Sequence, residues 1–133
     1  MSDELTRMTA NQAVAELRAG HITPLDLINA AERRIAAVDT AVNALPTLCL
    51  DRARDHARAL MAGKRRDAED EAGWLAGLPV AIKDLADVAG VRTTYGSPIY
   101  ADHVPTTPPS PAGISRKHGS RFVTGLKSPR LMS

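Results

Sequence analysis

Several residue types and patterns are scarce in this sequence, and each absence narrows the possibilities. Aromatic residues make up only 3% of the 133 residues, so the core must be aliphatic and lacks the large side chains that often anchor interfaces. The single cysteine, Cys49, cannot form an internal disulfide, and no apolar run reaches the length of a membrane-spanning helix. A net charge of +2 gives no general attraction to nucleic acid or membranes. With an N-terminal stretch too polar for a secretory signal, these absences favour a cytoplasmic protein.

Hydrophobic spacing and capping residues predict a helical first half. Thr9 and Gln12 match a capping box, and Thr23 followed by Pro24 offers a second helix start, because the N–H that proline lacks has no partner there. Apolar extended segments follow the helices, and this combination indicates the α/β class. The expected elements are helices over 9–19, 24–38 and 51–62 and strands near 78–83 and 91–95.

The composition changes near the end of the chain, which divides it into residues 1–105 and a tail, 106–133. After Asp102 the sequence contains no acidic residue but has five prolines and five cations. A segment with so little apolar periodicity cannot offset its ordering entropy. We therefore expect a disordered, basic, Pro- and Ser-rich tail.

Lys83 stands directly after the apolar run Leu78–Ile82. An amine acts as a base only when it is neutral, and removal from water favours the neutral form. Such a lysine could take a proton from a serine and so activate it as a nucleophile. Spacing alone favours a simpler interpretation, in which the ammonium group of a strand-end lysine extends to solvent.

The stretch GLPVAIKDLADVAGVRTTYGS resembles the lysine segment of the amidase signature family. The family pattern is Gly-x-Pro-apolar-small-apolar-Lys-Asp, then Asp-Val-x-Gly, then Thr-Thr-x-Gly-Ser, and the resemblance covers about residues 5–105. It implies the N-terminal helices and first strands of an amidase-signature mixed sheet. The matching positions are Gly77, Pro79, Lys83, Asp84, Asp87, Val88, Gly90, Thr93, Thr94, Gly96 and Ser97.

The resemblance implies a hydrolase that converts a carboxylic amide to an acid and ammonia or an amine. Its triad would be serine, cis-serine and lysine, with Lys83 as the base and an acyl-serine intermediate. The substrate would be a small linear amide, and neither a metal nor an organic cofactor is expected. Asp84, which follows the lysine, is expected to fix the next turn rather than to act as an acid.

Both family serines are absent from the sequence, because no Gly-Gly-Ser-Ser-Gly-Gly-Ser-like stretch occurs in it. By family resemblance, Ser97 corresponds to a structural turn. We therefore expect a truncated, inactive fragment and hypothesise a reading-frame disruption near Thr107. The strand carrying Lys83 would then lack sheet neighbours.

Two alternatives stay open at this point. The chain could belong to the amidase subunit of a glutamyl-tRNA amidotransferase and assemble with partner subunits, or, as a stand-alone amidase, form a homodimer. It could instead be a non-catalytic binding module that uses its basic tail, although the scarcity of aromatic residues makes nucleic acid an unexpected partner. Cys49 is expected to be a core thiol, and the four histidines lack the spacing of metal ligands.

Overall fold

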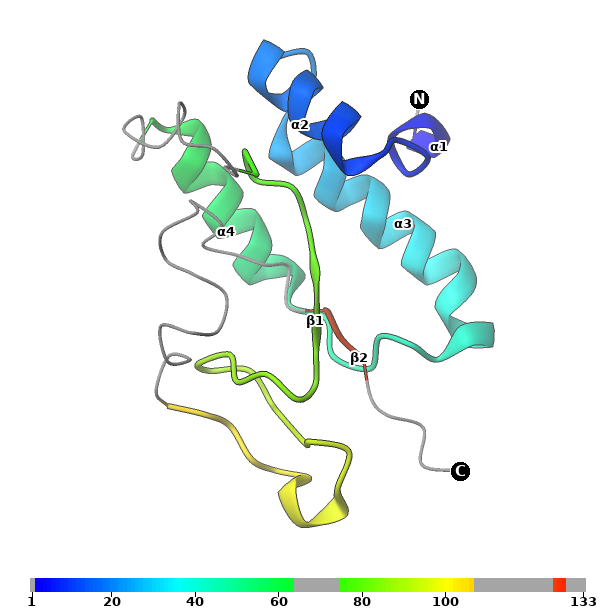
Figure 1. The fold of residues 1–133 in the computed structure, drawn as a ribbon, viewed down its shortest axis with the longest axis vertical. Coiled ribbons are helices and arrows are strands. Elements are labelled where there is room, and N and C mark those ends of the chain that lie inside the picture. The colour runs from blue at the N-terminus through cyan, green and yellow to red at the C-terminus, as the bar shows by residue number, and fades with distance from the viewer. Residues whose placement is uncertain (1, 64–74, 107–125, 129–133) are drawn as a thin grey trace.

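The computed structural model describes residues 2–63, 75–106 and 126–128, and Figure 1 shows their arrangement. Helices occupy the first half, and an extended segment leads from them into a long loop over residues 84–106. The α/β class is confirmed, although helix predominates in the described part. The elements are α1 (Ser2–Leu5), α2 (Ala10–Ala19), α3 (Pro24–Val42), α4 (Leu50–Met61), β1 (Ala81–Lys83), the 3₁₀ helix η2 (Pro98–Tyr100) and β2 (Leu126–Ser128).

Two capping boxes start α2 and α3. The Thr9 hydroxyl accepts a hydrogen bond from the Gln12 N–H, and the Gln12 side chain accepts one from the Thr9 N–H. Thr23 and Asp26 repeat the arrangement, with the Thr23 N–H 2.8 Å from the Asp26 carboxylate. The start of α3 at Pro24 agrees with the prediction, but the helix continues to Val42, beyond the expected end at residue 38.

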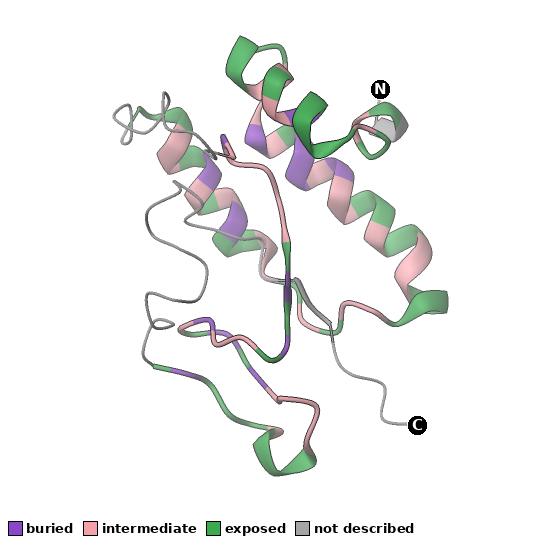
Figure 2. Ribbon diagram, in the orientation of Figure 1, coloured by how far each residue is buried: buried purple, intermediate pink, exposed green. Residues whose placement is uncertain are grey.

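Helices α3 and α4 pack through small aliphatic side chains. Ile28 of α3 is buried against Ala53 and Ala57 of α4, and the two alanines allow the helix backbones to approach closely. At the edge of this contact, the Arg54 guanidinium forms an ion pair with the Glu32 carboxylate. In Figure 2 the buried residues of both helices face one another, so the helical core lies between α3 and α4.

A three-residue parallel pairing joins β1 to β2. Its register matches Ala81 with Leu126 and Lys83 with Ser128. The strand that carries Lys83 therefore has a sheet neighbour, contrary to expectation. The tail forms a strand at residues 126–128, while the rest of the predicted disorder, in 107–125 and 129–133, lies outside the described residues.

The extended segment is less regular than predicted. Of the expected strand at 78–83, only the last three residues pair, and a turn closes just before it through the Leu78 N–H and the Leu75 carbonyl, 2.8 Å apart. No strand spans 91–95: Val91 forms an isolated antiparallel bridge with Val88. Left-handed backbone at Gly90 and Tyr95 bends this segment at both ends. Within the described ranges, no helix is both long and apolar enough to cross a membrane.

Candidate active site

Lys83 and Asp84 lie on opposite faces of the chain at the end of β1. Exposure alternates here: Ile82 and Asp84 are buried, with only 7% and 5% of their surface exposed, whereas Lys83 is exposed. Figure 2 shows the same alternation along β1. Successive side chains of a strand point to opposite sides. In this structure the Lys83 side chain is therefore exposed, because only its neighbours on the other face, Ile82 and Asp84, are buried.

Asp84 ties the end of β1 to the middle of the following loop. Its carboxylate accepts the Thr94 N–H, with both oxygens 3.1 Å from the nitrogen. The Thr94 hydroxyl donates a further hydrogen bond to the same carboxylate. The interpretation that Asp84 fixes the turn is confirmed. Sequence reasoning did not identify its partner, since nothing in the spacing alone linked Asp84 to the Thr-Thr pair.

The loop that follows Lys83 closes on itself through backbone hydrogen bonds. The Thr93 N–H donates to the His103 carbonyl at 2.9 Å, and the Gly90 N–H donates to the Pro105 carbonyl at 2.8 Å. Thr93 is fully buried. Ser97 caps η2, with its hydroxyl 3.3 Å from the Ile99 nitrogen. The expectation that Ser97 serves a structural turn is confirmed.

The loop is also attached to the rest of the protein. Arg52 of α4 donates a hydrogen bond from its guanidinium to the Ala89 carbonyl at 2.6 Å. Beneath the loop, Ile82, Val88 and Val91 form an apolar cluster against which Cys49 packs. Cys49 is half-buried, which agrees in part with the expected core thiol.

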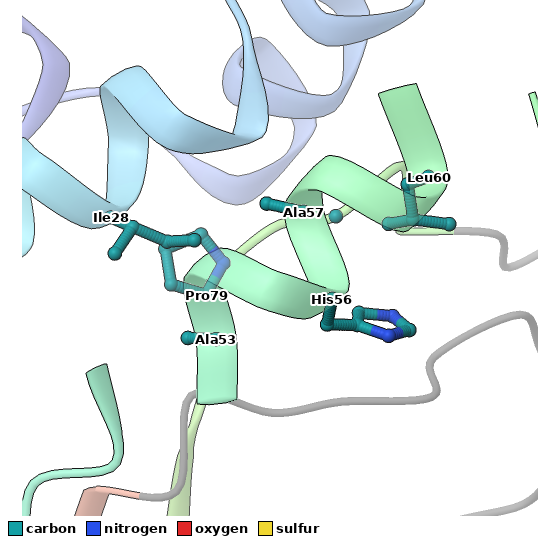
Figure 3. Close-up of a pocket in the computed structure, with 7 residues that line it drawn as sticks. Ile28, Ala53, His56, Ala57, Leu60 and Pro79 are labelled. Atoms are coloured by element: carbon teal, nitrogen blue, oxygen red, sulfur yellow. The ribbon is translucent and has the colours of Figure 1, made fainter. Parts of the chain in front are cut away.

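The approach to β1 is held between the helices. An added Cβ on Gly77, whose φ is +90°, would meet Pro24 Cγ of α3 at 2.7 Å and Leu60 Cδ1 of α4 at 3.2 Å. Pro79 follows and lines a small hollow beside Ile28 and Ala57, shown in Figure 3. The hollow contains about 200 Å³ of empty space, part of which is open to solvent. The Gly77–Pro79 motif thus seats the segment against the helix pair.

A second polar contact in the loop escaped the sequence reasoning. The Tyr95 hydroxyl donates a hydrogen bond to Asp87, which raises the pKa of the Tyr95 phenol above its ordinary value of 10.0. The Tyr95 ring also packs edge-on against Tyr100, with ring centroids 5.1 Å apart, and lies 5.8 Å from the His103 ring. The closely spaced aromatic residues within "TTYGSPIYADH" were the sequence feature from which packing of these rings could have been predicted.

The described residues place no paired serines beside Lys83. The register sets Ser128 of β2 opposite it along the backbone. The four other serines of the tail, Ser110, Ser115, Ser120 and Ser133, lie outside the described residues. Across the described ranges, no group of three or more histidine, cysteine, aspartate or glutamate side chains is arranged to hold a metal ion.

Comparisons with known proteins show which family this chain resembles. A family model described as Amidase matches residues 26–117. A glutamyl-tRNA(Gln) amidotransferase subunit from Streptomyces coelicolor is 35% identical over 105 residues, which are 79% of this chain and 20% of the relative. The same kind of subunit from Roseiflexus sp. is 40% identical over 101 residues, which are 76% of this chain and 20% of the relative.

A solved structure agrees with these matches. This solved structure is described by the words "An unexpected vestigial protein complex reveals the evolutionary origins of an s-triazine catabolic enzyme". The TM-score is 0.69 at 28% identity, and the match covers 92% of this chain and 25% of the solved one. This chain spans about a fifth of the length of the curated relatives. The match of the family model over most of the sequence, together with the lysine segment seated on α3 and α4, shows that the chain belongs to the amidase family.

Proposed function

We propose that this chain supplies the lysine base of an amide-hydrolysing enzyme. The observation that carries the proposal is the conformation of residues 77–97. Three distinctive motif positions there have physical roles, since Gly77 clears the helix pair, Asp84 binds Thr94 and Ser97 caps a turn. Gly77 and Asp84 fix the backbone before and after Lys83, whereas Lys83 itself extends to solvent. A fixed backbone on both sides of an exposed lysine holds the amine in a defined position, as a catalytic base requires.

In the proposed reaction, the neutral Lys83 amine accepts the proton of a bridging serine, which takes the proton of a second serine. The oxygen of the second serine attacks the amide carbonyl carbon. The carbon–nitrogen bond then breaks, the departing nitrogen takes up a proton, and an acyl-serine remains. Water hydrolyses the acyl-serine to the free acid and regenerates the serine. Both serines would come from outside residues 1–106, in the larger part of the length of the relatives.

The exposure of Lys83 bears directly on this proposal. A lysine in water is protonated at neutral pH and is a poor base. Contacts from the remaining four-fifths of a relative's length would have to cover the exposed face of β1 and remove water from the amine. The face opposite to Asp84 is the place where those contacts are required.

A chimera tests the proposal. Residues 1–106 of this chain replace the corresponding residues of the Roseiflexus relative, and ammonia release from glutamine and from small amides is measured. Lys83→Ala and Lys83→Arg should each lower kcat by about 10²- to 10⁴-fold, the usual contribution of a general base, because arginine stays charged and cannot accept the proton.

Arg33→Ala is the matched control, because it removes one exposed positive charge from α3 and should leave kcat unchanged. A chimera in which Lys83→Ala hydrolyses amides as fast as the unsubstituted protein contradicts the assignment of Lys83 as the base. If the unsubstituted chimera is inactive, the proposal that residues 1–106 of this chain can supply a working lysine base is wrong.

A second candidate function is that of an amidotransferase subunit. The names of the curated relatives favour it, since both relatives described above are glutamyl-tRNA(Gln) amidotransferase subunits. In this version the ammonia released from glutamine passes to a partner subunit that modifies Glu-tRNA, and the chain works in the cytoplasm. Co-purification of the chimera with the other Roseiflexus subunits, and formation of Gln-tRNA by that assembly, would support it. Glutamine hydrolysis without binding to those subunits would support a stand-alone amidase.

A further inference from the structure

We propose that Asp84 and Thr94 form a clamp that positions Lys83 for the reaction proposed above, on which this inference rests. Asp84 is a positioning residue in this scheme, because its carboxylate acts on Lys83 through the backbone. The clamp consists of three hydrogen-bond contacts, two from the Thr94 N–H and one from the Thr94 hydroxyl, all to the Asp84 carboxylate.

The Asp84 carboxylate is buried. Asp84 is only 5% exposed, and a buried carboxylate is costly unless hydrogen bonds satisfy it. Thr94 meets this need with both its backbone and its side-chain donor. The carboxylate is therefore fixed in one orientation, since release from Thr94 would leave a buried charge with fewer donors.

Side chains alternate in direction along β1 and into Asp84. Asp84 follows Lys83 directly, and adjacent side chains at the end of a strand point to opposite faces. Holding the Asp84 side chain in the interior therefore sets the direction in which the Lys83 side chain leaves the backbone. A catalytic amine benefits from such a constraint, because the geometry of a reacting group strongly affects the rate.

The loop also has attachments other than the clamp. Arg52 holds the Ala89 carbonyl, Gly90 is bonded to Pro105, and Thr93 is bonded to His103. None of these contacts involves Asp84. Loss of the clamp should therefore leave the loop folded and loosen its junction with β1, where Lys83 lies.

The test uses the full 133-residue chain labelled with ¹⁵N. Asp84→Ala should speed hydrogen exchange of the Thr94 amide by about tenfold to a hundredfold, as expected for loss of a charge-assisted hydrogen bond. It should also increase fast backbone motion at Lys83, measured by ¹⁵N relaxation, while the Gly90 and Thr93 amides keep their exchange rates. Thr94→Ser, which retains both donors, should keep the native exchange rate and the native backbone motion. Thr94→Val, which retains only the backbone donor, should give values between those of the native chain and those of Asp84→Ala. Asp102→Ala removes an exposed acid of the same loop and serves as the control.

The chimera supplies the catalytic measurement. Asp84→Ala should lower kcat at least about tenfold with KM unchanged, since the change affects the orientation of the base rather than substrate binding. Unchanged motion at Lys83, or an unchanged kcat in a chimera that Lys83→Ala inactivates, would overturn the clamp. If Lys83→Ala leaves activity intact, the proposed function fails instead, while the exchange and relaxation data still report whether Asp84 holds Thr94.

Discussion

Replacing Gly77 with alanine tests how the lysine segment is seated on the helices. Gly77 has a φ of +90°, and an added Cβ would lie 2.7 Å from Pro24 Cγ and 2.9 Å from Pro24 Cβ. Real Cβ atoms essentially never approach other atoms so closely. The proline ring cannot rotate away, and Pro24 is buried at the start of α3. The backbone at residue 77 must therefore move, and the movement continues along the chain towards Lys83.

Two contributions set the loss in free energy of unfolding that Gly77→Ala causes. A left-handed backbone costs a non-glycine residue roughly 1–2 kcal/mol, and insertion of a methyl group into a filled space costs about 1–3 kcal/mol. Gly77→Ala should therefore lower the free energy of unfolding by about 2–5 kcal/mol. A domain of this size has a total of only about 5–15 kcal/mol, so the variant should be severely weakened.

Urea unfolding followed by circular dichroism measures the effect. The midpoint should fall by about 1 M or more for Gly77→Ala. Gly20→Ala is the matched control, because Gly20 also has a left-handed backbone, with φ +73°, but an added Cβ meets no atom within 4 Å. Its loss should be limited to the backbone contribution of roughly 1–2 kcal/mol. Equal losses for the two variants would refute the close approach of Gly77 to the helix pair.

Two further predictions concern titrating groups. The Thr23 side chain, followed by its backbone N–H, lowers the pKa of Asp26 below its ordinary value of 3.8. The stabilisation from Asp26 is therefore complete above about pH 4 and is lost as the pH falls through the lowered pKa. In acid unfolding curves, Thr23→Val should make the free energy of unfolding fall less over this pH range than in the native chain. The hydrogen bond to Asp87 raises the pKa of Tyr95, so in a Tyr100→Phe background the phenolate absorbance should appear above pH 10. Asp87→Asn should move that titration to lower pH, and an unchanged titration would contradict the contact.

The helix starts could be predicted from the sequence because their determinants are local. Thr9 with Gln12, and Thr23 with Pro24, fix the first turns within four residues. The end of α3 was missed because it depends on a side chain beyond the apolar stripe. The Asp39 carboxylate accepts the Ala44 N–H at 2.8 Å, and Asn43 adopts a left-handed conformation with φ 52°.

The site was predicted less completely than the helices, for a related reason. The turn-fixing role of Asp84 follows from its place after a strand, but its partner Thr94 lies ten residues further along. The bond from Arg52 to Ala89 spans 37 residues and has no local pattern. Lys83 follows an apolar run, but strand alternation places the buried side chain of Ile82 and the exposed side chain of Lys83 on different faces.

The parallel pairing of β1 with β2 has a consequence for the order of folding. Parallel strands cannot be joined by a tight hairpin, and residues 84–125 separate these two in the sequence. Closing so long a stretch of chain costs entropy before only three pairs of residues are gained. The capped helices and the packing of α3 on α4 depend on nearer contacts and should form first. The sheet then grows on a helical platform that is already assembled.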